Sequence, residues 1–284
     1  MIKTVLQDLF NFIKKPDDQQ IKLSFKNKLL YIFILLIFEL VVTYLFIIPV
    51  LEWIDGLVGL DTADTSYDTF VQVFIPAVIF APLVEELIFR HLLRYQGIKT
   101  KVVSVNRWRK IFPYLVYSSS ICFGLIHISN YANSSIIFLF LSPIIIISQL
   151  IGGMILAFIR VRLTFLWGVL YHAFWNLWVV IAIPTAEHLL LEPYVENTAS
   201  YTIKIEEQLF FDDTEEQSIM ADSTGGKIYS LNIKQYSVQH VLDTLYTKNK
   251  YCTGDILINL SLKSKNGIKK DKLLNILQKE YDIE

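Results

Sequence analysis

The sequence has few cysteines and almost no net charge, and both features exclude classes of function. Of its 284 residues only Cys122 and Cys252 are cysteines, too few and too far apart for a disulfide framework or a cysteine metal site. The formal net charge is −1, and the chain has no basic stripe with interleaved aromatic residues, so nucleic-acid binding is not indicated. We expect no cleavable signal peptide, because the first long apolar run, from Leu29, is long enough to span a membrane.

Apolar residues, by contrast, are abundant. They make up 53% of the chain, and the mean hydropathy of +0.43 is typical of a membrane protein. Five apolar runs approach or exceed the roughly 20 residues that cross ~30 Å of hydrocarbon. The predicted spans are residues 29–51, 70–93, 111–130, 135–159 and 163–184. Residues 2–13 have apolar side chains at helical spacing, which predicts either an amphipathic helix on the membrane surface or a packed N-terminal helix.

Basic residues in the loops predict the orientation of the bundle. Residues 1–28 contain six lysines, residues 94–110 contain six basic residues, and Arg160 and Arg162 close the fourth span. The opposite loops, 52–69, 131–134 and 185–199, contain no Lys or Arg. Basic loops stay in the cytoplasm, so the N-terminus is predicted to be cytoplasmic and everything after the fifth span extracytoplasmic.

The end of the second span carries three ionisable residues, Glu85, Glu86 and Arg90. Each charge costs roughly 2.5–3.5 kcal/mol inside a bilayer, so intramembrane charges indicate function by default. Glu86 and Arg90 are four residues apart and can pair on one helix face. Glu85 lies about 100° around the helix and is free to point elsewhere. The alternative is an ion-paired helix end at the level of the lipid headgroups.

Two further polar motifs lie inside predicted spans. Phe123 and His127 are four residues apart in the third span, and His172 and Asn176 have the same spacing in the fifth. Together with Glu85-Glu86-x-x-x-Arg90, and in this order, they resemble the three motifs of the CAAX protease and bacteriocin-processing family of intramembrane proteases. The resemblance covers residues 25–185 and leaves the C-terminal part outside. It implies an endopeptidase of a bacterial cytoplasmic membrane that cleaves a membrane-associated, prenylated or precursor protein.

The resemblance also implies roles for the motif residues. Glu85 matches the general base that activates water, and His127 would position or deprotonate the same water. His172 and Asn176 would donate hydrogen bonds to the oxyanion, while Glu86, Arg90 and Phe123 would support the site. The competing chemistry makes Glu85, His127 and His172 ligands of a zinc ion, and the sequence leaves the cofactor open.

Two non-catalytic functions remain as alternative hypotheses. One is a non-catalytic immunity or adaptor protein of the same fold, whose polar cluster only holds helices together. The other is a proton- or ion-coupled transporter, since Glu and His residues also serve proton relays. The sequence shows neither repeated halves nor paired broken helices, which disfavours a transporter.

The hydrophobic pattern of the chain changes near residue 198, where the long apolar runs end. Alternating runs at 201–205, 229–233 and 256–260, with helical spacing at 238–246 and 273–281, predict the order β, β, α, β, α. The predicted fold is therefore an all-α membrane bundle of five transmembrane helices plus an N-terminal amphipathic helix (residues 1–197), followed by a small α+β domain (residues 198–284). No catalytic cluster is apparent in this domain, so we expect it to bind an extracytoplasmic partner or to gate access.

Overall fold

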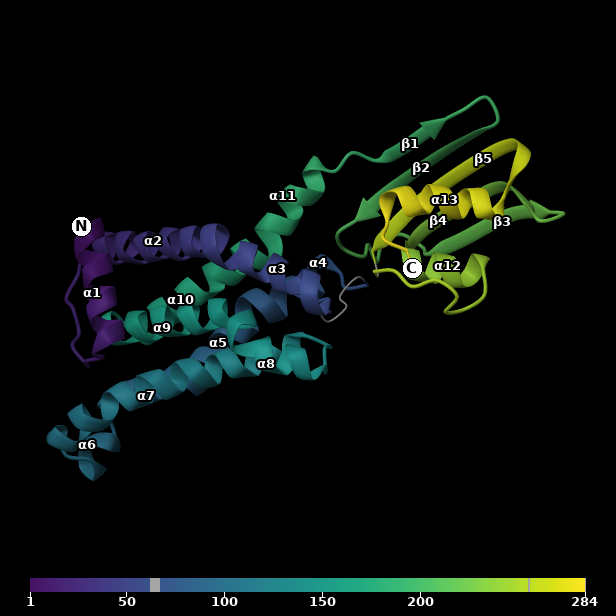
Figure 1. The fold of residues 1–284 in the computed structure, drawn as a ribbon. Helices are drawn as coiled ribbons and strands as arrows, with labels where there is room; N and C mark the ends of the chain where they lie inside the picture. Colours follow the sequence, from purple (N-terminus) through teal and green to yellow (C-terminus); the bar gives the residue numbers. More distant parts are fainter. Residues whose placement is uncertain (62–66, 255, 284) are drawn as a thin grey trace. The chain divides into compact units, whose positions relative to one another are not determined.

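Five helices long and apolar enough to cross a membrane precede a small antiparallel sheet in this computed structural model, which describes residues 1–61, 67–254 and 256–283 (Figure 1). The spans are Phe25–Val58, Phe70–Leu93, Val105–Asn130, Ile136–Arg162 and Phe165–Leu190, which confirms the five predicted spans. Two compact units can be distinguished. The first comprises Met1–Ala63 and Pro76–Leu177, and the second comprises Asp64–Ile75 and Trp178–Glu284.

Most spans consist of several helical segments. The α-helices of the N-terminal segment and the spans are α1 (Ile2–Lys14), α2 (Phe25–Val42), α3 (Ile48–Val58), α4 (Phe70–Phe74), α5 (Ala81–Glu85), α6 (Lys99–Val102), α7 (Val105–Ile126), α8 (Ile136–Ile145), α9 (Ile147–Arg162), α10 (Phe165–Asn176) and α11 (Ile183–Leu190). π-Helical turns fill Thr43–Ile47, Ile75–Phe80, Glu86–Arg90 and Leu177–Ala182, and 3₁₀ turns fill His91–Leu93 and His127–Asn130.

Prolines explain three of the four π-helical turns. Pro49, Pro82 and Pro184 each lie at the start of the α-helix that follows such a turn. Proline lacks the backbone N–H and its ring clashes with the preceding turn, so the helix widens there instead of breaking. The remaining π-helical turn, Glu86–Arg90, has no such proline and carries two of the charged motif residues.

Helix α9 is the centre of the bundle unit. Every residue from Ile155 to Arg162 is buried, and α9 packs against α7, α10, α2 and α1. Gly152 and Gly153 allow side chains from other helices to approach its backbone closely. The core therefore forms around α9, with α2 and α7 on either side of it.

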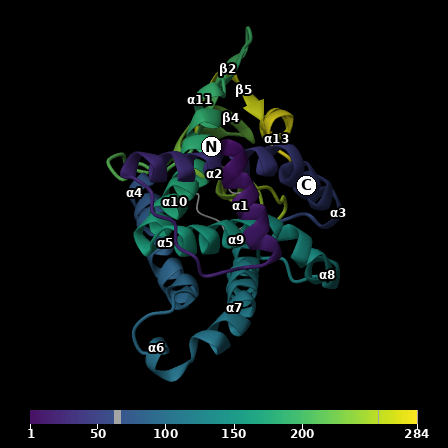
Figure 2. The ribbon, with the colours of Figure 1, turned by 90° about the vertical axis from the view of Figure 1, so that its left-hand side faces the viewer.

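The N-terminal helix is packed against the bundle. α1 buries Val5, Leu9 and Phe12 against α2 and α9, and it lies across the ends of these helices instead of alongside them (Figures 1 and 2). Of the two interpretations of residues 2–13, the structure therefore has the packed helix.

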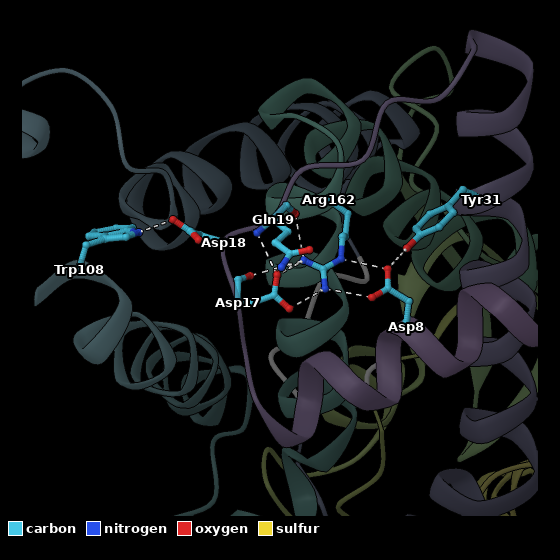
Figure 3. A network of polar contacts seen from close by, with 7 residues as sticks. All are labelled: Asp8, Asp17, Asp18, Gln19, Tyr31, Trp108 and Arg162. Atoms are coloured by element: carbon cyan, nitrogen blue, oxygen red, sulfur yellow. Dashed lines mark hydrogen bonds and ion pairs between the residues drawn. The ribbon is translucent and has the colours of Figure 1, made fainter. Parts of the chain in front are cut away.

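A cluster of polar contacts joins this N-terminal segment to the rest of the bundle. The Arg162 guanidinium donates hydrogen bonds to Asp8 at 2.9 Å and to Asp17 at 2.9 and 3.1 Å, as Figure 3 shows. Tyr31 donates to Asp8 at 3.1 Å, and the indole of Trp108 donates to Asp18 at 2.8 Å. Contacts from α2, α7 and α9 thus converge on the first 20 residues.

The second unit contains a five-stranded antiparallel sheet in the order β1-β2-β5-β4-β3. Its elements are β1 (Tyr194–Asn197), β2 (Tyr201–Gln208), β3 (Ser218–Thr224), β4 (Lys227–Ser237), α12 (Val238–Leu245), β5 (Leu257–Lys269) and α13 (Lys270–Glu280). Ile203 lies opposite Leu262, and Leu262 lies opposite Leu231, so the buried residues of the central strands share one face. Both helices cover that apolar face, and the small α+β domain is confirmed.

The predicted strand order was incomplete, because the sheet has two further strands at its edges. β1 is only four residues long, and most of β3 is exposed, including Met220 at 63%. Edge strands with little apolar alternation give no period-2 pattern in the sequence. The strand expected at 256–260 starts at Leu257 and runs on to Lys269.

Candidate active site

The charged motif of the second span is buried in the bundle. Glu86 and Arg90 are both 0% exposed, and Arg90 Nε lies 3.7 Å from Glu86 Oε1. Arg90 also donates to the Gly153 carbonyl at 3.3 Å, and its guanidinium carbon lies 4.0 Å from the centre of the Phe123 ring. Arg90 is thus held by a carboxylate, a backbone carbonyl and an aromatic face, from three different spans.

Two glycines provide the space for this ion pair. A Cβ at Gly168 would lie 3.0 Å from Glu86 Oε2, and one at Gly153 would lie 3.3 Å from Arg90 Nη2. Any larger residue would push the charged groups away from the α10 and α9 backbones. These glycines were not singled out in the sequence, because nothing in their local pattern distinguishes them from other small residues of a span.

His172 lies between the two adjacent carboxylates. Its Nδ1 is 3.5 Å from Glu86 Oε1, and its Nε2 is 3.7 Å from Glu85 Oε2. The imidazole is almost fully buried, whereas the Glu85 side chain is 21% exposed. Glu85 is therefore the carboxylate of the pair that both meets the histidine and stays accessible.

Several polar atoms at this point have no hydrogen-bond partner within the described part of the chain. They are Glu85 Oε2, both carboxylate oxygens of Glu86, Arg90 Nε and Nη1, and His172 Nδ1. An unsatisfied buried polar group costs about 1–3 kcal/mol, so a cluster of them is expensive to keep for structure alone. A water molecule or a reactant bound beside His172 could form the missing hydrogen bonds to these atoms.

His127 lies at the C-terminal end of α7 and is half-buried. Its Nδ1 is 2.7 Å from the Phe123 carbonyl oxygen, which only accepts, so Nδ1 carries the hydrogen and Nε2 is left as an acceptor. The Phe123 ring centre is 4.7 Å from that of His127 and 5.7 Å from that of His172. Phe123 thus contacts both histidines, while among the described residues no hydrogen bond or ion pair joins His127 to Glu85.

Asn176 connects the two motif helices. Its Nδ2 donates to the Ala77 carbonyl at 2.7 Å. Ala77 lies in the π-helical turn Ile75–Phe80, where the carbonyl of residue i accepts from residue i+5. For Ala77 that residue is Pro82, which has no N–H, and the amide of Asn176 supplies the missing donor.

A second buried polar pair lies next to the site. Tyr171 donates a short hydrogen bond to Glu39 of the first span, and both side chains are buried. A Cβ at Gly152 would lie only 2.8 Å from Glu39 Oε1. A carboxylate inside an apolar span is a visible signal in the sequence, but nothing in the sequence identifies Tyr171 as its partner.

The residues proposed as zinc ligands do not form a three-ligand set. Within residues 1–61, 67–254 and 256–283, no group of three His, Cys, Asp or Glu side chains is arranged to hold a metal ion. Glu85 and His172 face each other, whereas no described hydrogen bond or ion pair joins His127 to either of them.

Comparisons with known proteins agree with the motifs. Residues 67–178, less than half of the chain, match the family model described as type II CAAX prenyl endopeptidase Rce1-like. No match was found among curated proteins or among solved structures. The matched segment contains all three polar motifs, and the resemblance inferred from them is confirmed. Residues 67–178 are therefore similar to the Rce1-like family of CAAX prenyl endopeptidases, which are proteases.

Proposed function

We propose that this protein is an intramembrane endopeptidase that hydrolyses a peptide bond in a membrane-associated, prenylated or precursor protein. The observation that carries the proposal is the position of Glu85. It is a partly exposed carboxylate within 3.7 Å of a buried histidine, beside a second carboxylate that is already paired with Arg90. A scaffold would need only the paired carboxylate.

Glu85 acts as the general base. It removes a proton from water as the water oxygen bonds to the scissile carbonyl carbon, and it returns that proton to the amine nitrogen when the C–N bond breaks. The 3.7 Å separation of Glu85 from His172 exceeds a hydrogen bond, and such contacts often tighten only when substrate is bound. His127 orients the water through Nε2, the ring nitrogen that the Phe123 carbonyl leaves free.

His172 and Asn176 stabilise the oxyanion of the tetrahedral intermediate. An asparagine amide has two hydrogens, and the contact with the Ala77 carbonyl uses only one of them. Removal of one oxyanion donor typically raises the barrier by ~3–4 kcal/mol. Glu86 and Arg90 hold His172 and the motif helix in place and do not take part in proton transfer.

Substitution of Glu85 tests the proposal directly. Glu85→Gln keeps the size of the side chain but removes the base, so cleavage of a membrane-reconstituted substrate should fall by about 10²–10⁴-fold. Glu187→Gln, an exposed acid on α11, is the matched control and should retain the wild-type rate. Thermal unfolding should be similar for all three proteins. A Glu85→Gln enzyme that folds and cleaves at the wild-type rate would favour the non-catalytic adaptor.

Dialysis against a metal chelator separates the two chemistries. We expect an unchanged rate, because the described residues form no group of three candidate ligands. Loss of cleavage that is restored only by added zinc would instead assign Glu85, His127 and His172 as ligands.

We further propose that the sheet domain recognises a partner or substrate through its polar face. The face opposite the helices carries Lys204, Ser261 and Asn232 on neighbouring strands. Lys263, two residues after Ser261 on β5, lies on the same face. Charge reversal by Lys204→Glu and Lys263→Glu should slow cleavage of the natural substrate but not of a short soluble peptide. Equal loss with both substrates would mean that the domain only stabilises the fold.

A further inference from the structure

A long apolar groove runs along the first span, within the bundle unit. It has a volume of about 600 Å³ and lies between α2 and α10. Its walls are apolar over the whole length, with one cationic residue, Lys26, at one end. The lining residues are Lys26, Leu29, Leu30, Ile32, Phe33, Leu36, Tyr171 and Phe174.

The groove follows a single face of α2. Lys26, Leu30 and Phe33 recur at intervals of three and four residues, which brings them into line on a helix. From Lys26 to Leu36 the helix rises about 15 Å at 1.5 Å per residue. This is half of the ~30 Å hydrocarbon core, the depth that one acyl chain of one leaflet fills.

A basic residue lies at the end of the groove. Lys26 is exposed, and no described residue forms an ion pair or a hydrogen bond with its ammonium group. Lys22 lies four residues earlier, in the segment before α2 begins. Basic residues beside a membrane helix attract anionic lipids, with about 1 kcal/mol for each lysine near the surface.

We propose that this groove is a binding site for an anionic glycerophospholipid. One acyl chain lies against Leu30, Phe33 and Leu36, and the phosphate lies at Lys26. The floor of the groove includes Tyr171, the residue before His172, so the bound chain packs on the helix that carries the candidate active site. The proposal does not depend on catalysis, since it concerns only lipid binding.

Lipid retention by the full chain tests this site. The purified protein in detergent is titrated with phosphatidylglycerol or phosphatidylcholine of identical chains, and bound lipid is counted by native mass spectrometry. Lys26→Gln should weaken phosphatidylglycerol retention about fivefold, the factor that corresponds to ~1 kcal/mol. Lys28→Gln is the matched control, because Lys28 lies over the Trp167 ring, 6.0 Å from its centre, and does not line the groove.

A second pair of variants tests the contribution of the apolar wall of the groove. Phe33→Ala should reduce retention several-fold, whereas Ile37→Ala, also exposed on α2 but outside the groove, should not. Equal retention of both lipids by the wild type, or equal losses in Lys26→Gln and Lys28→Gln, would overturn the proposal. Displacement of the lipid by a farnesylated peptide would assign the groove to the substrate chain instead.

Discussion

Glu39 is a buried residue of the first span that belongs to none of the three motifs. It is a carboxylate inside the first span, 3% exposed, and its described hydrogen-bond donor is the hydroxyl of Tyr171. Its other oxygen lies close to Gly152, where an added Cβ would be only 2.8 Å away. Tyr171 adjoins His172, so this pair also fixes the rotation of α10 about its axis at the histidine.

Tyr171→Phe should therefore destabilise the bundle. It removes the hydroxyl and leaves the Glu39 oxygen buried without a donor, which costs about 1–3 kcal/mol. Thermal unfolding in detergent measures this loss. Tyr114→Phe, at a position 73% exposed, should be neutral. The double variant Glu39→Leu with Tyr171→Phe should recover part of the loss, and a double variant less stable than Tyr171→Phe alone would show that the pair is not the cause.

At the scale of elements, the N-terminal segment depends on α9. Arg162 is 5% exposed and binds both Asp8 of α1 and Asp17 of the following loop, while Tyr31 of α2 donates to the same Asp8 (Figure 3). Hydrogen bonds to charged groups contribute about 1.5–3 kcal/mol each. One guanidinium thus joins α1, the loop after it and the end of the fourth span.

Arg162→Gln should loosen α1 without unfolding the spans. We expect the free energy of opening the N-terminal segment to fall by about 2 kcal/mol or more, because two carboxylates lose their cation. Limited proteolysis within residues 15–21 should then accelerate by at least tenfold. Arg109→Gln, an exposed arginine of α7, is the control and should leave the cleavage rate unchanged. Equal protection in Arg162→Gln would show that apolar packing of Val5, Leu9 and Phe12 suffices.

The edge strand β1 carries a pH-sensitive contact. Hydrogen bonds from Tyr194 and then from Tyr201, each at 2.5 Å, lower the pKa of Glu196 from 4.5 to about 2, with a smaller effect of Lys279. A depressed pKa in the folded state stabilises the fold above the ordinary pKa of the group. This stability is lost as the pH falls from about 4.5 to about 2.

Hydrogen exchange in the full chain can follow this loss. Amide protection of β1 and β2 should decrease, relative to Glu196→Gln at each pH, as the pH falls from 4.5 toward 2. The glutamine variant should show low protection of the edge at every pH, because its side chain has no charge for the two tyrosines to stabilise. If the difference in amide protection of β1 and β2 between the wild type and Glu196→Gln stayed constant across this pH range, the stability of the edge would not depend on ionisation of Glu196.

At the scale of the whole molecule, the number of spans decides where each soluble part lies. With five spans, we expect the N-terminal segment and the sheet domain to lie on opposite sides of the membrane. The basic loops before and between the spans favour a cytoplasmic N-terminus. We therefore expect the sheet domain to be extracytoplasmic.

Cys252 reports this topology without any added tag. It is exposed in the sheet domain, and a membrane-impermeant thiol reagent should label it in intact cells. A Cys122→Ser background removes the other free cysteine, which lies in the third span, and Cys252→Ser should abolish the labelling. In the cysteine-free protein, Thr100→Cys should react only after the cells are broken. Labelling of Thr100→Cys but not of Cys252 in intact cells would reverse the orientation.

The sequence by itself determined the spans and the motif residues. A long apolar run has few alternatives to a transmembrane helix, because every backbone polar group must be satisfied in lipid. Charged and imidazole side chains inside such runs are costly enough to identify Glu85, Glu86, Arg90 and the histidines without coordinates. The edge strands β1 and β3 were not predicted, because β1 has only four residues and most of β3 is exposed, so neither shows a clear apolar alternation.

Only the tertiary structure decided which of these residues meet. Four-residue spacing put Glu86 and Arg90 on one face, but no spacing along the chain relates Glu85 to His172 or Glu39 to Tyr171. Those contacts arise from helices whose axes approach where Gly152, Gly153 and Gly168 have no side chain. The same packing joins Asn176 to the Ala77 carbonyl that Pro82 leaves without a donor. Contacts between distant segments depend on the packing of the whole bundle, whereas a span and its polar residues depend only on local composition and the membrane.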